Sequence, residues 1–289
     1  MTTSTPRRSR LSFVILIVST ILVTLPFLWM VSLALKSPAE IAESAPRLIP
    51  RAPGFGNVTE ALQGYGLLRA MFNSFAVGIG AIVANCVLAT LAGYAFAKLR
   101  FRGSNVVFYA IIATAMVPGA VTLVPLFLIA KGMPFVGGND VLGAGGTGLL
   151  DSLPGVLLPH ILAPLNVFLA RQYFLELPDE LGEAGRVDGA SELRIFVRIY
   201  VPLARPLIAV IAIFAFTGSW DDFLWPLVIT SSEQTRTVQL ALATFLSGDS
   251  IAYGPAMAAA VLVTLPVLAV FVFNQRHFLS GLSAGSVKG

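Results

Sequence analysis

Charged residues are scarce in this chain. Asp, Glu, Lys and Arg make up 12% of its 289 residues, which is about half of their share in soluble domains. Hydrophobic residues make up 56% of the chain, and the mean hydropathy is +0.83. This composition excludes an ordinary water-soluble domain and predicts a membrane protein. In such a protein the formal net charge of +4 indicates orientation in the membrane rather than nucleic-acid binding.

Cysteine, histidine and phosphate-binding motifs are also sparse. The one cysteine, Cys86, lies in an apolar run, which excludes an intrachain disulfide and predicts a small buried side chain. His160 and His277 are far apart and have no cysteine partners, so we predict no metal site. The sequence has no G-x-x-x-x-G-K-S/T loop. We therefore expect no bound cofactor, no catalytic residue and no ATP hydrolysis by this chain alone.

Six apolar runs are long enough to cross a bilayer as helices, which takes roughly 20 residues. The first run follows basic residues, but it is too long for the apolar core of a signal peptide and no A-x-A-like cleavage site follows it. We interpret it as an uncleaved span. Prolines inside the runs are compatible with membrane helices, because neighbouring helices and water satisfy the freed carbonyls. The runs cover about 11–35, 71–97, 106–130, 153–174, 206–229 and 254–273.

The distribution of Lys and Arg predicts the orientation. An even number of spans places both termini on one side, and roughly two-thirds of the Lys and Arg residues fall on that side, which the positive-inside rule assigns to the cytosol. We therefore expect a cytosolic tail at 1–10, a permease domain at 11–275 and a cytosolic tail at 276–289. Three longer connections would face outward, at about 36–70, 131–152 and 230–253. The second contains GGNDVLGAGGTG and is expected to be flexible.

One charged segment, EAGRVDGASELRIFVRIYVPLARP at 183–206, interrupts the apolar pattern. Pro178 suits the first position of a helix, and the acidic residues after it suit its N-terminal turn. Asp188-Gly189 is a turn signal, and a second helix can start near Ser191 and stop near Pro202. We predict a cytosolic helix-turn-helix over about 177–202, called the elbow below. An amphipathic helix resting on lipid and a helix that docks on a cytosolic partner both fit this pattern.

The charged segment resembles the EAA loop of bacterial ATP-binding-cassette (ABC) importer permeases. That pattern is EAA, three residues, Gly, about nine residues, then I-x-L-P. Gly185 in place of the second alanine and Val201 in place of the usual leucine are mild departures. The residues on the pattern are Glu183, Ala184, Gly189, Ile199 and Pro202.

Further motifs extend the resemblance to nearly the whole chain after Leu11. They are similar to the carbohydrate-uptake branch of these importers, and in particular to the second permease subunit of the maltose type. They read GYAFAKLRFRG at 93–103, MVPGAVTLVPLFL at 116–128, WDDFLWPLVIT at 220–230 and FNQRHFLSGLSAGSVKG at 273–289.

The resemblance implies an all-α polytopic membrane protein with six transmembrane helices of the type I ABC importer kind and a cytosolic EAA coupling helix. Such a permease lies in the bacterial inner (cytoplasmic) membrane and moves a sugar, oligosaccharide or related polyol or glycerol phosphate inward by alternating access. Its partners would be a homologous second permease, two cytosolic ATP-binding subunits that carry ATP and Mg, and an extracytoplasmic solute-binding protein. The residues expected to couple the elbow to the ATPase are Glu183, Ala184, Gly185, Asp188, Gly189, Ala190, Leu193, Phe196 and Pro202.

A group of aromatic and polar residues suits contact with a sugar, because sugar rings stack on aromatic faces and hydroxyls hydrogen-bond to carboxylates. An aromatic belt with capped helix ends is the alternative interpretation. The residues of this possible solute pathway are Trp220, Asp221, Asp222, Trp225, Asn73 and Asn85.

Two other classes of membrane protein are weighed against a permease. An ion-driven secondary transporter usually carries ionisable residues deep in its spans, and these spans have none in their central parts. A six-helix intramembrane protease needs a nucleophilic Ser in a glycine-rich turn together with a His on a helix. His160 has no such partner evident in the sequence.

Overall fold

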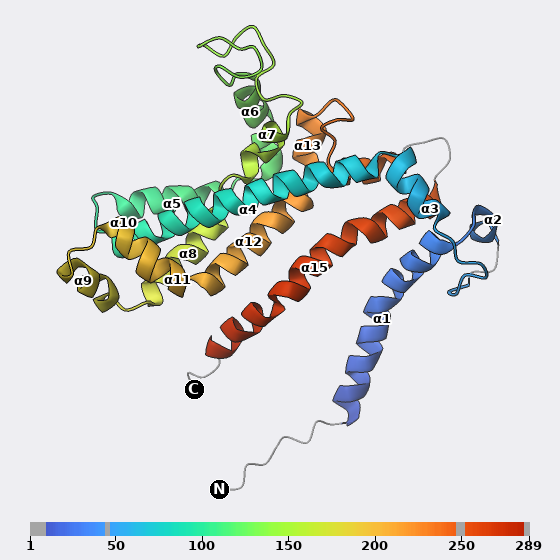
Figure 1. The fold of residues 1–289 in the computed structure, drawn as a ribbon, viewed down its shortest axis with the longest axis horizontal. Coiled ribbons are helices and arrows are strands. Elements are labelled where there is room, and N and C mark those ends of the chain that lie inside the picture. The colour runs from blue at the N-terminus through green and yellow to red at the C-terminus, as the bar shows by residue number, and fades with distance from the viewer. Residues whose placement is uncertain (1–9, 44–46, 247–251, 286–289) are drawn as a thin grey trace. The chain divides into compact units, whose positions relative to one another are not determined.

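The computed structural model describes residues 10–43, 47–246 and 252–285, with side chains placed for 11–43, 47–246 and 252–273 (Figure 1). Within these ranges every regular element is a helix and no strand occurs, which confirms the predicted all-α class. Most of the predicted tail at 1–10 lies outside the described residues, as do 286–289 of the other tail. The chain divides into two units, 1–68 with 241–265, and 69–240 with 266–289.

The first unit is built on α1 (Arg10–Leu35), which matches the first apolar run and contains Pro26 within it. The buried side chain of Asn57 satisfies carbonyls at and just after the end of α1. Its amide donates to Ala34 O at 3.1 Å and to Lys36 O at 2.7 Å. This unit also contains α2 (Pro38–Ile41), α3 (Gly56–Thr59), a π-helical turn (Glu60–Gly64) and the first part of α15 (Tyr253–Gly285).

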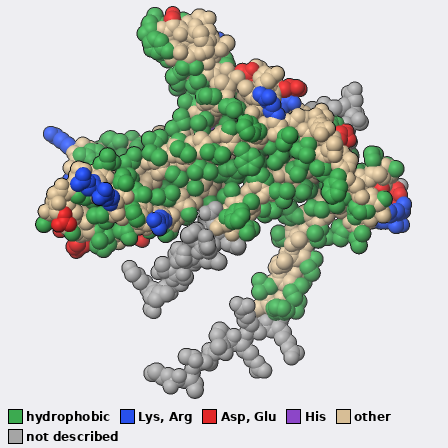
Figure 2. All heavy atoms as spheres, viewed as in Figure 1, with side chains coloured by type: hydrophobic (Ala, Val, Ile, Leu, Met, Phe, Trp, Pro, Cys, Tyr) green, Lys and Arg blue, Asp and Glu red, His purple; other side chains and the backbone are tan. Residues whose placement is uncertain are grey.

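The second unit is organised around α4 (Leu67–Lys98), which lies against α8 and α12 (Figure 1). Hydrophobic side chains cover much of its visible face, and charged side chains gather at the end formed by the elbow (Figure 2). Its other helices are α5 (Ser104–Thr114), α6 (Gly119–Lys131), α7 (Leu153–Leu157), α8 (Pro164–Glu176), α9 (Glu180–Val187), α10 (Glu192–Ile195), α11 (Val201–Leu203), α12 (Arg205–Trp220), α13 (Leu224–Ile229) and α14 (Val238–Thr244), the last of which continues into the first unit.

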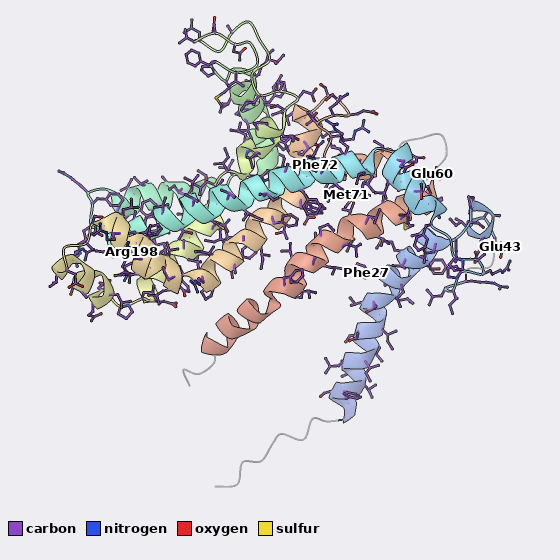
Figure 3. All side chains as sticks on the ribbon, viewed as in Figure 1. Phe27, Glu43, Glu60, Met71, Phe72 and Arg198 are labelled. Carbon is purple, nitrogen blue, oxygen red and sulfur yellow. The ribbon has the colours of Figure 1, made fainter. Side chains whose placement is uncertain are left out.

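Large apolar side chains remain exposed along the long helices, as expected for surfaces that face lipid or another apolar surface. Phe27 on α1 and Phe72 on α4, both labelled in Figure 3, are 52% and 72% exposed. Three described helical segments are long and apolar enough to cross a membrane unaided, Leu11–Leu35, Leu67–Lys98 and Tyr253–Phe273. They coincide with the first, second and sixth apolar runs.

The other three apolar runs are broken helices. α5 and α6 meet at 104°, and the segment Leu153–His160 meets α8 at 46°. Proline disfavours a helical conformation in the residue before it. Both breaks fit this rule, because Pro118 directly precedes α6 and Pro164 is the first residue of α8. The fifth run holds α12 and α13, separated at residues 221–223. A third bent pair joins the segment Glu192–Leu203 to α12 at 81°. Among the described residues the number of spans reaches six only if each of the three bent pairs is one span, so the count stays a prediction.

The glycine-rich connection at 131–152, which its composition predicts to be flexible, contains hydrogen bonds and close backbone contacts of its own. Asn139 donates to Lys131 O at 2.7 Å and accepts from Gly146 N at 2.8 Å. A Cβ on Gly146 would lie 2.2 Å from Gly137 O, so two stretches of backbone touch here. The glycines therefore permit close backbone packing and not only flexibility.

Close contact between α4 and α8 depends on Gly93. A Cβ added there would lie 2.3 Å from Ala170 Cβ and 2.7 Å from the Ala170 carbonyl carbon. Because part of the obstacle is backbone, the two helices would have to separate. Small residues allow this kind of approach between membrane helices.

We expect Gly93→Ala to lower the free energy of unfolding by about 1–3 kcal/mol, the usual cost of overpacking. Gly218→Ala is the matched control, because a Cβ at Gly218 in α12 meets nothing within 4 Å. Thermal unfolding of the purified chain in one detergent measures both. Equal unfolding temperatures for the two variants would contradict the close packing of α4 and α8.

Candidate functional site

The elbow forms two helical segments joined by a turn. α9 begins at Glu180, two residues later than expected, so Pro178 precedes the helix instead of starting it. The second segment runs through α10, a π-helical turn (Phe196–Tyr200) and α11. It ends at Leu203 and so includes Pro202, which follows the wider π-helical turn.

Two glycines shape the elbow in different ways. Gly189, in the turn, has a φ of +75°, and a Cβ there would meet nothing within 4 Å. A glycine is therefore favoured here by the left-handed backbone conformation and not by a lack of space for a side chain. Gly185 is buried, and a Cβ on it would lie 2.9 Å from Ile195 Cγ1. Gly185, one of the two departures from the EAA pattern, therefore lies where α9 packs against α10.

The predicted coupling residues divide into an exposed and a buried set. Phe196 is 7% exposed and packs on Tyr94, with ring centroids 5.0 Å apart. By contrast, Leu193 is 65% exposed and the neighbouring Val187 is 87% exposed. Gly185 is buried with Phe196, and Ala190 is half-buried. The exposed set contains Glu183, Ala184, Asp188, Gly189, Leu193 and Pro202.

The last turn of α4 fastens the elbow through Lys98, a residue that sequence reasoning did not select. Its side chain is 4% exposed, donates to Leu177 O at 2.6 Å and pairs with the Asp179 carboxylate. The hydrogen bond and charge of Lys98 lower the pKa of Asp179 below its ordinary value. The available signal was the motif GYAFAKLRFRG, which holds Lys98 and Tyr94 four residues apart.

A polar cleft of about 420 Å³ lies between the end of α4 and the elbow. Its lining holds both basic and acidic side chains, which form the pairs Lys98–Asp179 and Arg186–Glu192. Its lining residues are Lys98, Leu99, Arg100, Asp179, Glu183, Arg186, Glu192 and Tyr200.

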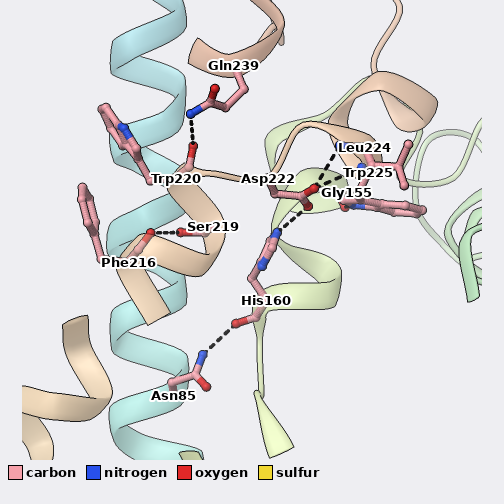
Figure 4. Close-up of polar contacts among 10 residues, drawn as sticks. All are labelled: Asn85, Gly155, His160, Phe216, Ser219, Trp220, Asp222, Leu224, Trp225 and Gln239. Atoms are coloured by element: carbon pink, nitrogen blue, oxygen red, sulfur yellow. Dashed lines mark hydrogen bonds and ion pairs between the residues drawn. The ribbon is translucent and has the colours of Figure 1, made fainter. Parts of the chain in front are cut away.

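The two tryptophans of the possible solute pathway, both labelled in Figure 4, are buried within the chain. Trp220 is 1% exposed, with its ring centroid 4.9 Å from that of Phe75 and 5.2 Å from that of Phe216. Trp225 is 3% exposed, and its Nε1 donates to Gly155 O at 3.0 Å. These contacts favour packing over sugar stacking for both rings.

Asp222 holds two helix breaks together. Its Oδ1 accepts from the backbone N–H groups of Leu224 at 3.1 Å and Trp225 at 3.3 Å, at the start of α13. Its Oδ2 lies 3.0 Å from His160 Nε2 (Figure 4). His160, for which the sequence offered no partner, is the last residue of the 3₁₀ turn before α8. The neighbouring Asp221 is exposed.

Asn85 satisfies the backbone at the break before α8. Its amide nitrogen donates to His160 O at 2.7 Å and to Ala81 O at 2.9 Å, and its oxygen accepts from Ala163 N at 2.9 Å. A broken membrane helix is tolerated when freed backbone groups find partners of this kind. Both Asn85 and Asn73 are buried.

Asn73 has a similar structural role on the loop that follows α13. Its amide donates to Gln234 O at 2.8 Å and to Arg236 O at 2.9 Å. Asp151 holds the same loop by accepting from the N–H groups of Ser231 and Ser232, each at 3.0 Å. Hydrogen bonds from the loop, with that of Thr235 the largest contribution, hold the pKa of Asp151 well below its ordinary value.

Helices of this length and hydropathy, broken at satisfied backbone positions and joined to a polar elbow, define a polytopic membrane protein. The sequence comparison places it further. Residues 87–283 match the family described as binding-protein-dependent transport system inner membrane component. The chain belongs to this family and is therefore a permease component of a transport system, not an enzyme.

Curated relatives cover most of the chain. It is 34% identical to an arabinooligosaccharides transport system permease protein of Bacillus subtilis, over 83% of this chain and 81% of the relative. It is 31% identical to a trehalose transport system permease protein of Mycobacterium tuberculosis, over 92% of both chains. A lactose transport system permease protein of Rhizobium radiobacter is also 31% identical, over 91% of this chain and 90% of the relative.

The fold matches a solved structure. A bacterial ABC transporter involved in the import of the acidic polysaccharide alginate aligns with a TM-score of 0.79, over 96% of this chain and 100% of that chain, at 23% identity. At this identity the likeness shows the fold alone.

Among the described residues, no group of three or more His, Cys, Asp or Glu side chains could hold a metal ion.

We expect Asn85→Ala to lower the free energy of unfolding by about 3 kcal/mol, because buried backbone groups at His160 and Ala163 lose their partner. Asn105→Ala, at an exposed position of α5, is the matched control and should change it little. Thermal unfolding in detergent compares the two variants. A stable Asn85→Ala protein would show that this side chain does not hold the break.

Proposed function

We propose that the chain is the permease subunit of an ATP-driven ABC importer that moves a carbohydrate into the cytoplasm, coupled to a separate ATPase through the elbow. The solute would be a sugar, an oligosaccharide or a related polyol or glycerol phosphate. The named solutes of the curated relatives, arabinooligosaccharides, trehalose and lactose, support this class. The family match supports a permease rather than an ion-driven transporter or an intramembrane protease.

The observation that carries the coupling role is the exposed apolar surface of the elbow. Leu193 and Val187 project from a charged segment outside the apolar runs and are 65% and 87% exposed. A partly apolar helical surface of this kind fits a groove on a partner protein. Gly185 and Phe196 lie on the inner side, so in this proposal they set the position of the docking surface and do not touch the partner.

The proposed assembly has this permease, a homologous second permease, two cytosolic ATPases and an external solute-binding protein. ATP and Mg bind to the ATPases, and each permease presents its elbow to one of them. Closure of the ATPases on ATP moves the elbows, and this changes which side of the membrane the solute pathway faces. Both termini and the elbow lie in the cytosol, as the distribution of Lys and Arg favours.

We propose different roles for the residues of the possible solute pathway. Trp220, Trp225, Asn73, Asn85 and Asp222 have packing or hydrogen-bonding roles within the chain. We propose that they shape the pathway by fixing the broken helices. Asp221 is exposed beside the α12–α13 break and is the residue of this group that we propose meets the solute.

Replacing Leu193 by Asp, Gly189 by Val or Glu183 by Lys should reduce solute uptake and solute-stimulated ATP hydrolysis together, by about tenfold or more. The first places a charge in an apolar contact. The second forces a β-branched residue into a left-handed backbone, and the third reverses a charge on the docking surface. Uptake and ATPase rates in reconstituted vesicles measure both effects, with co-purification of the subunits as the assembly check.

Gly103→Val is the matched control for Gly189→Val. Gly103 also has a positive φ, of +86°, with open space around its Cβ, and it lies in a turn next to α5. It should strain the chain equally but leave coupling intact. Normal transport by the three elbow variants in assembled complexes would contradict the coupling role and favour the alternative, an amphipathic helix that rests on lipid.

A further inference from the structure

The end of α4 contacts the elbow through two residues that lie on the same face of the helix, Tyr94 and Lys98, because positions four apart are one turn apart. Lys98 is buried, with only 4% of its side chain exposed. Burying an ammonium group is costly unless it is paired and hydrogen-bonded. Here it has both kinds of partner, a carbonyl and a carboxylate.

The partners of Lys98 lie where the chain enters the elbow. Leu177 follows α8 directly, and its carbonyl accepts from Lys98 Nζ at 2.6 Å. Asp179 directly precedes α9, and its carboxylate pairs with the same ammonium group. One side chain of α4 therefore holds the end of α8 and the start of α9 together.

Tyr94 holds the second helical segment of the elbow. Its hydroxyl donates to Glu192 Oε2 at 3.1 Å. Glu192 in turn accepts from Arg186 on α9, with Nε to Oε1 at 2.6 Å and Nη2 to Oε2 at 3.3 Å. A two-point contact between Arg and a carboxylate fixes orientation as well as distance. This chain of bonds joins α4, α10 and α9.

Aromatic packing fills the space beneath these polar contacts. The Tyr94 ring lies 5.8 Å from Phe174, 5.0 Å from Phe196 and 5.0 Å from Tyr200 by ring centroids. Phe174 is 0% and Tyr200 1% exposed. Close-packed interiors resist deformation, so the elbow has little freedom to rotate about the end of α4.

We propose that Lys98 and Tyr94 are positioning residues that make the last turn of α4 and the elbow one rigid body. This rests on the proposed coupling function of the elbow. Movement imposed on the elbow by the ATPase then displaces α4 directly, and not only α8 and α12, which continue from the elbow along the chain. α4 also carries Asn85 and Asn73, which hold the helix break before α8 and the loop at 234–236.

The first test measures coupling. In the complete reconstituted importer, Lys98→Met and Tyr94→Phe should each lower the number of solute molecules imported per ATP hydrolysed, Lys98→Met by about tenfold because it removes a charge-assisted contact. Tyr94→Phe removes one hydroxyl and keeps the ring, so it tests the inference even if Lys98→Met fails to assemble. Lys98→Arg keeps the cation and should restore most of the ratio, which a general loss of stability would not predict.

Matched controls separate the effect of losing the contact with the elbow from the effect of the substitution itself. Lys131→Met changes an exposed lysine at the C-terminal end of α6, and Tyr109→Phe changes an exposed tyrosine of α5. Both should keep the wild-type ratio of solute to ATP. A fall in the controls as large as in Lys98→Met and Tyr94→Phe would contradict a specific role for the two α4 residues.

The second test measures the rigid body itself. Spin labels at Val87 on α4 and Arg194 on the elbow, both exposed, are introduced into a chain with Cys86→Ala. The distance distribution between them should be narrow and unchanged when ATP is added to the complex. Lys98→Met should broaden it.

The outcomes distinguish this inference from the proposed function. If Leu193→Asp abolishes transport while Lys98→Met and Tyr94→Phe keep the wild-type ratio and a narrow distance distribution, the rigid-body inference is wrong and the coupling role stands. If Leu193→Asp has no effect, the coupling role is wrong, and the distance distributions alone decide whether α4 and the elbow move together. A distance that changes with ATP in the wild-type protein overturns the inference in either case.

Discussion

The constraint on which the rest of this structure depends is that backbone groups freed at a helix break must find partners within the chain. Water is scarce in the hydrocarbon region, and each unsatisfied group costs several kcal/mol. The chain breaks three of its apolar runs, and at two of these breaks polar side chains supply the partners. Asn85 serves the break before α8, and Asp222 serves the start of α13.

This constraint explains why polar residues that suit sugar binding instead form hydrogen bonds with backbone groups of the chain. A carboxylate or amide within an apolar run is equally suited to hydroxyl groups of a solute and to backbone groups of the chain. The sequence does not distinguish the two roles, because the choice depends on which helix ends lie nearby. His160 shows the same limit, since its partner Asp222 is 62 residues away, in the break between α12 and α13.

Local features of the fold were predictable because they depend on neighbours in sequence. The all-α class and the three long spans follow from composition and run length, and the turn at Asp188-Gly189 follows from residue type. The 104° bend between α5 and α6 was not predicted, because a proline in an apolar run is compatible with a continuous helix or a break. Pro26 and Pro125 remain inside helices, whereas Pro118 marks a break.

The role of Lys98 in fastening the elbow was also not predictable, because its partners Leu177 and Asp179 lie about 80 positions later in the chain. The elbow differs from the apolar runs because most of its polar groups are exposed. Its inner side is packed on α4 and its outer side carries Val187 and Leu193 in the open. An apolar side chain in that position gains from burial against a partner protein.

The central claim is that this surface docks on a cytosolic ATPase, and site-specific photo-crosslinking from position 193 tests it most directly. A photoreactive residue at Leu193 in the assembled complex should form its adduct with the ATPase, while one at Val106, an exposed position of α5, should not. Adducts from position 193 to lipid, with none to the ATPase, would contradict the account.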